Sequence, residues 1–344
     1  MAYTTIDKPS EHFSILLYDG NSGTQAITGV GFQPDFSWTK VYNTADAHIL
    51  VDSVRGDYAV RSNTAAAQYS TGVSWQFDTD GFTMTGTSGE LNYSGRSYVV
   101  WNWKGANGTA SNTDGDFTTT VSANQTAGFS VLTGTSDSAA QKDVGHGLGK
   151  IPDVVFARNL ASGYNWDVWF RTLGYTSTLQ LNDASASPRT GFGSGTFTTT
   201  TFSTKDDYSS KGGVNYLYYC FTSIKGYSKI SQYTGNGDNG NGPVVYTGFK
   251  PAMVMIKRSD TTGNYVIFDN TRSPFNTADN AVSADLNDRE YTSADGVVGI
   301  DILSNGFKCK DNHTTRNASG GVYQYLAFAE NPFVTSTGIP ATAR

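Results

Sequence analysis

The chain of 344 residues carries one sequence pattern three times, and this internal repeat restricts its possible folds more than any other feature. In each copy a proline precedes a run of apolar residues, and a cation follows the proline six positions later. The prolines are Pro34, Pro152 and Pro251, and the cations are Lys40, Arg158 and Lys257. Proline is tolerated at the first position of a β-strand, because its missing N–H is not needed in the hydrogen-bond ladder there. Each copy therefore predicts a strand that the proline opens.

A second motif, rich in aromatic residues, ends each copy of the repeat. It occupies residues 98–103, 216–221 and 323–328. The first two copies of both motifs are separated by the same 118 residues, which argues against chance similarity. The closing segments are apolar on both faces, so we expect each to lie inside a sheet with a neighbour on either side. Trp103, Phe221 and Phe328 are then expected at equivalent buried positions.

These two motifs divide the chain into residues 1–110, 111–226 and 227–344, the first with a short N-terminal segment and the last with a short C-terminal tail. Each unit has the size of a small β-sandwich or jelly roll. The first architecture we expect is three tandem β-sandwich repeats, of jelly-roll or concanavalin-like form. The second is a single pseudo-threefold body in which the repeats share a common core.

The composition predicts an all-β protein. Gly occurs 38 times, aromatic residues make up 13% of the chain and charged residues only 16%, whereas helical proteins draw on Glu, Lys, Ala and Leu. Asp80-Gly81 and Asn305-Gly306 each separate two segments of alternating apolar residues. Such dipeptides favour the tight turns of β-hairpins, because the turn residues must adopt positive φ.

Charge and hydropathy exclude several classes of partner. A net charge of −6 provides no basic surface for nucleic acid. No apolar run approaches the ~20 residues of a membrane-spanning helix, so we expect no membrane insertion. The first ten residues lack the basic and apolar regions of a secretory signal, and synthesis in a cytoplasm is expected.

No constellation of residues points to catalysis, a cofactor or a metal. The four histidines stand in neither a nucleophile motif nor a metal-type spacing, and the four Glu residues are scattered. Cys220 aligns with small residues of the other closing segments and is expected in the interior, and with Cys309 it forms no disulfide framework. The glycine- and asparagine-rich loop 235–242 has one carboxylate, which favours a hairpin tip over a calcium loop, although bound calcium stays open. We therefore expect no enzyme.

Asp52 and Arg55 follow the second apolar strand of the first repeat, and Asp269 and Arg272 take the same place in the third. This spacing predicts an ion pair that stabilises a turn. Exposed pairs of this kind contribute about 0–1 kcal/mol.

Several segments also resemble a known family. They are residues 92–98, the run 111–115 and the C-terminal segment 327–340, together with the repeat motifs. Over essentially its full length the chain resembles virion structural proteins of marine tailed bacteriophages, often labelled tail fibre or putative tail protein. The resemblance implies a virion protein made in the cytoplasm of the infected host, with other phage virion proteins as partners. Some relatives are described as concanavalin-like, which suggests that they bind glycans.

The expected function is therefore a non-enzymatic tail fibre or adhesin that contacts a glycan or outer-membrane receptor of the host envelope. A purely structural capsid-decoration or tail-scaffold protein is the first alternative, and a polysaccharide depolymerase is the second. A free carbohydrate-binding module is disfavoured by the missing export signal.

Receptor contact is expected in the loops where the repeats differ most, at residues 183–213, 235–242 and 308–320. The candidate receptor-binding residues are Tyr93, Asp238, Asn241, His313 and Arg316. Because weak glycan contacts become useful when several sites act together, we expect an oligomer, with a homotrimer favoured.

Overall fold

A computed structural model describes residues 3–136, 141–161, 163–185, 189–190, 196–204 and 213–342. The protein is all-β, with 47% strand and 3% helix, as the composition predicts. The helical residues form short 3-10 turns, among them η1 (Pro9–Glu11), η2 (Arg171–Leu173) and η3 (Ser293–Asp295). Within the described ranges, no helix has the length and apolar character needed to cross a membrane.

The first repeat forms a large and a small antiparallel sheet. The large sheet has the order β1 (Phe13–Asp19), β9 (Ser97–Trp103), β3 (Phe36–Val41), β4 (His48–Asp52), β5 (Tyr58–Arg61) and β6 (Tyr69–Ser70). The small sheet has the order β2 (Thr24–Thr28), β8 (Gly81–Thr85) and β7 (Ser74–Asp78). Strands β7 and β8 form the hairpin expected at Asp80-Gly81.

The second repeat is built in the same way with additional edge strands. Its large sheet has the order β10 (Ala110–Asn112), β11 (Thr119–Asn124), β12 (Phe129–Ser136), β19 (Val214–Phe221), β14 (Val154–Asn159), β15 (Asp167–Phe170), β16 (Ser177–Gln180) and β17 (Arg189–Thr190). Strands β13 (Lys142–Gly145) and β18 (Thr201–Thr204) form the small sheet. Strands β10 and β11 have no counterpart in the large sheets of the other repeats.

The large sheet of the third repeat has the order β20 (Ser228–Thr234), β27 (Val322–Pro332), β22 (Phe249–Arg258), β23 (Tyr265–Asp269) and β24 (Ala281–Ser283). Its small sheet contains β21 (Val244–Tyr246), β26 (Gly306–Cys309) and β25 (Ile300–Leu303). The hairpin expected at Asn305-Gly306 joins β25 to β26.

The four central strands follow one order in all three repeats, and the closing strand always has a neighbour on both sides. In the equivalent pairs, Phe36 lies opposite Trp103, Val154 opposite Phe221 and Met253 opposite Phe328. Strands β3 and β14 begin two residues after their prolines, as predicted. The prediction is wrong for the third copy, where β22 has already begun and Pro251 lies at a shift in register, a place that also tolerates the missing N–H.

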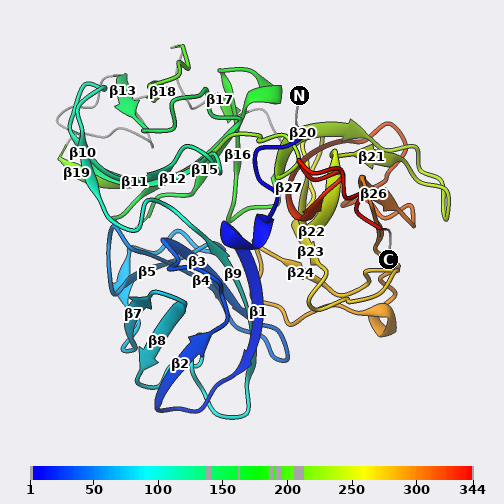
Figure 1. Cartoon of the computed structure of the whole chain (residues 1–344), viewed down its shortest axis with the longest axis horizontal. Helices are drawn as coiled ribbons and strands as arrows, with labels where there is room; N and C mark the ends of the chain where they lie inside the picture. The colour runs from blue at the N-terminus through cyan, green and yellow to red at the C-terminus, as the bar shows by residue number, and fades with distance from the viewer. Residues whose placement is uncertain are drawn as a thin grey trace.

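The three repeats surround one shared hydrophobic core, and Figure 1 shows them as three lobes around the centre of the molecule. Trp103, Phe221 and Phe328 are 2–3% exposed, and their ring centroids lie 5.4–5.9 Å apart in every pairing. The predicted equivalence of these aromatic residues is therefore confirmed. Smaller clusters fill the space between the large and small sheet of each repeat. A shared core matches the second architecture expected from the sequence, a single body around a pseudo-threefold axis.

The repeated cations join each repeat to the next in a closed ring. Each cation donates hydrogen bonds to two backbone carbonyls, one six residues further along its own repeat and one in a neighbouring repeat. The acceptors within the repeat are the carbonyl oxygens of Asp46 for Lys40, Tyr164 for Arg158 and Gly263 for Lys257. The acceptors in the neighbouring repeat are those of Asn287, Ala66 and Ala184, in the same order. Burial lowers the pKa of both lysines to about 8.

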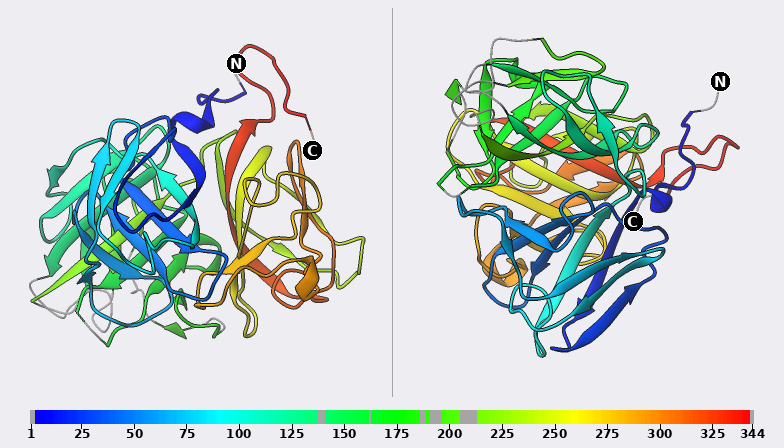
Figure 2. Two further views of the ribbon diagram at one scale, coloured as in Figure 1. Left: turned by 90° about the horizontal axis from the view of Figure 1, so that it is seen from below. Right: turned by 90° about the vertical axis from the view of Figure 1, so that its left-hand side faces the viewer.

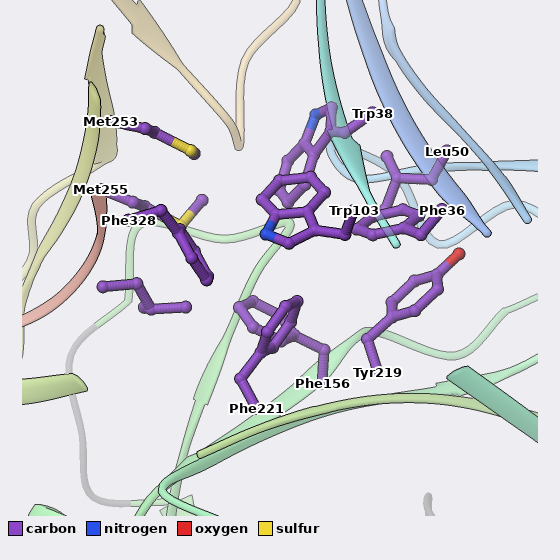
Figure 3. A pocket seen from close by; sticks show the side chains of 11 residues that line it. Phe36, Trp38, Leu50, Trp103, Phe156, Tyr219, Phe221, Met253, Met255 and Phe328 are labelled. Atoms are coloured by element: carbon purple, nitrogen blue, oxygen red, sulfur yellow. The ribbon is translucent and has the colours of Figure 1, made fainter. Parts of the chain in front are cut away.

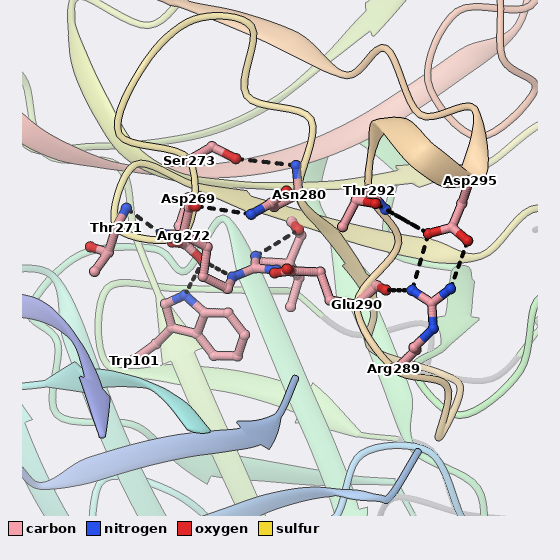
Figure 4. A network of polar contacts seen from close by, with 11 residues as sticks. Trp101, Asp269, Thr271, Arg272, Ser273, Asn280, Arg289, Glu290, Thr292 and Asp295 are labelled. Carbon is pink, nitrogen blue, oxygen red and sulfur yellow. Dashed lines mark hydrogen bonds and ion pairs between the residues drawn. The ribbon is translucent and has the colours of Figure 1, made fainter. Parts of the chain in front are cut away.

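The ion pairs expected after the second strand are present, but they are buried and not exposed. The side chains of Asp52 and Arg55 are 0% and 4% exposed, and those of Asp269 and Arg272 are 0% and 1% exposed. The expectation of a surface pair was wrong because the turns after β4 and β23 face the junctions between repeats. Figure 4 shows the pair in the third repeat, where Arg272 Nη1 also lies 2.8 Å from Glu290 Oε1.

Each of these aspartates also accepts a hydrogen bond from the closing strand of another repeat. Tyr219 Oη of β19 donates to Asp52 Oδ2 at 2.9 Å, and Trp101 Nε1 of β9 donates to Asp269 Oδ2 at 3.3 Å. In the second repeat, the position equivalent to Asp52 and Asp269 is occupied by the buried Phe170. The junctions are thus fixed by specific polar contacts as well as by apolar packing.

The two ends of the described chain lie on the same side of the molecule (Figure 2). Ser336 N donates to Asp7 Oδ1 at 2.6 Å, and the ring of Tyr3 lies 6.1 Å from that of Phe333. The first and last segments are therefore packed against each other.

Candidate functional site

Two of the loops expected to contact a receptor, 235–242 and 308–320, are joined at one end of the third repeat. The buried side chain of Asn317 makes the connection. Its Nδ2 donates to the carbonyl oxygens of Asp238 and Asp311 at 3.0 and 2.7 Å, and its Oδ1 accepts from Asn236 N at 2.9 Å. Most of the third loop, 183–213, lies outside the described residues.

Asp238 and Asn241 occupy the exposed tip of the first of these loops. Asp238 Oδ1 accepts from Asn241 N at 3.2 Å, and Asn241 Oδ1 accepts from Lys308 Nζ at 3.1 Å. In the part of the chain that the structure describes, there is no group of three or more His, Cys, Asp or Glu residues placed to hold a metal ion.

A pocket of about 310 Å³ opens beside the second loop, and it is the site to which His313 and Arg316 belong. One wall comes from β23 and β24, and the opposite wall comes from the segment around η3 and from residues 313–316. Tyr291 supplies an aromatic ring, while Asn264 and Ser283 add polar groups.

His313 presents one hydrogen-bond donor in the pocket. Burial lowers the pKa of the imidazole, and the neighbouring Arg316 lowers it further, so the ring is neutral at pH 7. Its Nδ1 accepts from Thr315 N at 3.3 Å and lies 2.8 Å from Thr315 Oγ1. The remaining nitrogen, Nε2, is then assigned the proton and is the ring's donor to a ligand.

Arg316 lines the same pocket, but its side chain is only 4% exposed. The guanidinium forms a two-pronged ion pair with Asp311, and its Cζ lies 5.7 Å from the ring centroid of Phe268. In the free protein Arg316 therefore stabilises the loop, and its positive charge is paired with Asp311.

The acidic residue of the pocket, Asp295, is held ionised. Arg289 donates to both of its oxygens at 2.7 and 3.1 Å, as Figure 4 shows, and the backbone N–H of Thr292 adds a third bond at 2.9 Å. These contacts lower the pKa of Asp295 to about 2. Because a general acid must carry a proton near neutral pH, Asp295 is suited to accepting hydrogen bonds and not to acid catalysis.

Sequence reasoning missed Tyr291 and Asp295 as parts of this site. Thr292 and Asp295 form a capping box around η3, in which each side chain accepts a hydrogen bond from the backbone of the other end. That Thr-x-x-Asp spacing is visible in the sequence and could have indicated the turn, but not its position beside residues 313–316.

Tyr93, the remaining predicted residue, belongs to the first repeat and lies between β8 and β9. Its side chain is 49% exposed, and Arg96 Cζ lies 5.3 Å from the ring centroid. The structure therefore places Tyr93 in a different repeat from the other four candidates.

The cavity at the centre of the molecule is a feature of the core. It has a volume of about 20 Å³ and is lined by Phe36, Trp103, Phe221, Met253 and other large side chains (Figure 3). A space of this size holds at most one water molecule, so no organic ligand fits.

Comparison with known proteins identifies one family. No curated protein and no solved structure matches the chain. The profile of a family described as "Domain of unknown function (DUF7483)" matches residues 8–332. The chain therefore belongs to the DUF7483 family.

Proposed function

We propose that this member of the DUF7483 family is a non-enzymatic surface protein of a bacteriophage virion, a tail fibre or adhesin that binds a glycan of the host envelope. Its fold is interpreted as three β-sandwich repeats fused around the shared core. Its partners are other virion proteins and the host-surface glycan, and a homotrimer is the favoured assembly.

The convergence of loops 235–242 and 308–320 beside the 310 Å³ pocket carries this proposal. Loops on a rigid β scaffold are common sites of recognition, and pockets of about 300–1,000 Å³ suit small ligands. The donor of His313, the acceptor of Asp295 and the ring of Tyr291 match the hydroxyl groups and the apolar face of a sugar.

The experiment measures binding of the full chain to purified lipopolysaccharide or capsular polysaccharide of the host by calorimetry. His313→Ala and Tyr291→Ala are each expected to weaken binding at least tenfold. Phe275→Ser is the matched control, because Phe275 is 79% exposed in the same repeat and does not line the pocket. Equal binding by all variants, or no binding by the wild type, would count against the adhesin and favour the structural role.

A further inference from the structure

A second groove, of about 370 Å³, runs between the first and second repeats and contains polar atoms that lack partners. The first repeat contributes Arg55, Tyr58 and Gln68 to it. Arg55 Nη1 and Gln68 Oε1 are shielded from bulk solvent, and neither has a hydrogen-bond partner among the described residues. A buried donor or acceptor without a partner costs about 1–3 kcal/mol, so two of them in one groove need a physical explanation.

The third repeat contains the same arrangement with its partner present. Arg55 and Arg272 are equivalent: the Nε of each donates to its aspartate at 2.7 Å, and the Nη2 of each reaches a backbone carbonyl of the preceding strand. The difference lies at Nη1. In Arg272 this atom donates to Glu290 Oε1 at 2.8 Å, whereas in Arg55 it donates to nothing.

Gln68 stands in the first repeat where Glu290 stands in the third. Gln68 N donates to Leu160 O at 3.1 Å, and Glu290 N donates to Tyr42 O at 2.9 Å. Leu160 and Tyr42 each follow a repeated cation by two residues, so the two contacts are equivalent. The first repeat thus has a neutral amide where the third has a carboxylate, and Arg55 lacks the second anionic partner that Arg272 has.

The floor of the groove is specific to the second repeat. It is lined by Thr118, Thr120, Thr133 and Thr135, of which Thr135 donates its hydroxyl hydrogen bond to Asn215 Oδ1. Thr120 pairs with Thr133 across β11 and β12, and β11 is one of the edge strands that the other repeats lack. Tyr58, 50% exposed, adds an aromatic ring. The groove therefore combines an unpaired guanidinium nitrogen, an unpaired carbonyl oxygen, several hydroxyl groups and a ring.

We propose that this groove binds an acidic saccharide and that the partly exposed Gln68 side chain turns aside on binding. This movement opens Arg55 Nη1 to the sugar carboxylate, in the position that the Glu290 carboxylate takes on Arg272. A sugar hydroxyl donates to Gln68 Oε1, and further hydroxyl groups pair with the threonine floor. The third repeat demonstrates that this arginine geometry accommodates two carboxylates, Asp269 and Glu290. The groove is separate from the pocket beside His313, so the two proposals can fail independently.

The test measures binding of the full chain to oligosaccharides of glucuronate and galacturonate and to their neutral glucose and galactose counterparts. Calorimetry at neutral pH and low salt should give at least tenfold tighter binding for an acidic oligosaccharide, because only this ligand supplies the missing carboxylate. His313→Ala should leave this binding unchanged.

The sharpest variant is Gln68→Glu, which supplies the carboxylate within the chain, as Glu290 does in the third repeat. It should lose acidic-saccharide binding at least tenfold while its melting temperature stays equal or rises. The double variant Thr120→Val and Thr133→Val should also weaken binding, whereas Thr24→Val, on another strand ladder, should not. Arg55 is not substituted, because its removal would leave the buried Asp52 carboxylate without its ion-pair partner.

Three results would overturn the proposal. They are equal affinity for acidic and neutral oligosaccharides, unchanged binding by Gln68→Glu, and no binding of any acidic oligosaccharide. In the last case the two atoms stay buried without a hydrogen-bond partner.

Discussion

At the scale of single residues, buried cations at the junctions join the repeats. The ammonium group of Lys40 is removed from water and bonds to carbonyl oxygens of two repeats, Asp46 O at 2.6 Å and Asn287 O at 3.3 Å. A buried charge is tolerated when hydrogen-bonded partners compensate for its lost hydration. The regular spacing of these cations was visible in the sequence. Their role was not, because their acceptors are backbone carbonyls, which leave no side-chain signature in a neighbouring repeat.

We expect Lys40→Met to destabilise the protein by about 2–5 kcal/mol, because two buried carbonyl oxygens lose a charged donor. Chemical denaturation measures the free energy of unfolding. The exposed Lys150→Met serves as the matched control and should change stability by less than about 0.5 kcal/mol. Similar small effects for both variants would contradict the role of the cation.

Asp285 is expected to make the stability of the folded protein depend on pH. Burial raises its pKa to about 6, against a lowering effect of Lys257 and of the Tyr265 N–H, while Asp183 raises it further. The folded protein thus holds the proton more tightly than the unfolded chain. The resulting stabilisation is complete below about pH 4 and is lost as the pH rises through about 6.

Asp285→Asn should remove this part of the pH dependence. The difference in unfolding free energy between wild type and variant should change by up to about 3 kcal/mol between pH 4 and pH 7, in the direction that favours the variant at higher pH. Denaturation curves at several pH values measure it. Parallel pH profiles for the two proteins would show that Asp285 titrates normally.

At the scale of elements, the closing strands β9, β19 and β27 organise the molecule. Alternate side chains of each strand face the shared core and the small sheet of the same repeat, so both faces are buried. The sequence predicted this placement because the segments are apolar on both faces. It could not predict β10 and β11, whose short polar segments resemble loops.

Truncation of the central aromatic residues tests these strands. Trp103→Ala, Phe221→Ala and Phe328→Ala should each cost about 3–5 kcal/mol, because each leaves a cavity where three rings meet. Thermal and chemical denaturation give the values. A near-neutral effect at one of the three positions would show that the repeats do not contribute equally to the core.

Only part of the pocket in the third repeat could be predicted from the sequence. The variable loops pointed to His313 and to the tip around Asp238. The partners Tyr291 and Asp295 come from a turn more than fifteen residues earlier in the sequence, and only the pairing of strands brings them together. Arg316 was expected to contact a ligand, but its Nε and Nη2 bind Asp311 and its Nη1 lies 3.4 Å from Thr315 Oγ1.

Asp295 is ionised and the pocket lining contains no second carboxyl group that could act as the general acid, so we expect the protein not to cleave polysaccharide there. Incubation with host capsule or lipopolysaccharide should release no oligosaccharide, because the acid in the pocket is already deprotonated above about pH 2. Release that disappears with Asp295→Asn would instead establish a depolymerase.

At the scale of the whole molecule, the shared core makes the three repeats one folding unit. A single repeat such as residues 111–226 would expose the apolar face that the others cover, so we expect it to remain unfolded or to aggregate. The full chain should unfold in one cooperative transition. Calorimetry measures this, and separate transitions for the repeats would favour three independent sandwiches.

The pseudo-threefold arrangement places three related repeats within one chain, and the proposed homotrimer would add a second level of multiplicity. Mass measurement in solution should give three times the chain mass of 36.9 kDa. If the protein is a monomer, each molecule has only the binding sites of one chain, and tighter binding through several linked chains is not expected.

The central claim is that the protein lies on a virion surface and presents the end of its third repeat to the host. Electron cryo-microscopy of the virion proposed to carry this chain tests it most directly. The three-lobed body should be found at the particle surface, with loops 235–242 and 308–320 facing outward. Absence of the chain from the particle, or burial of both loops against other virion proteins, would contradict this account.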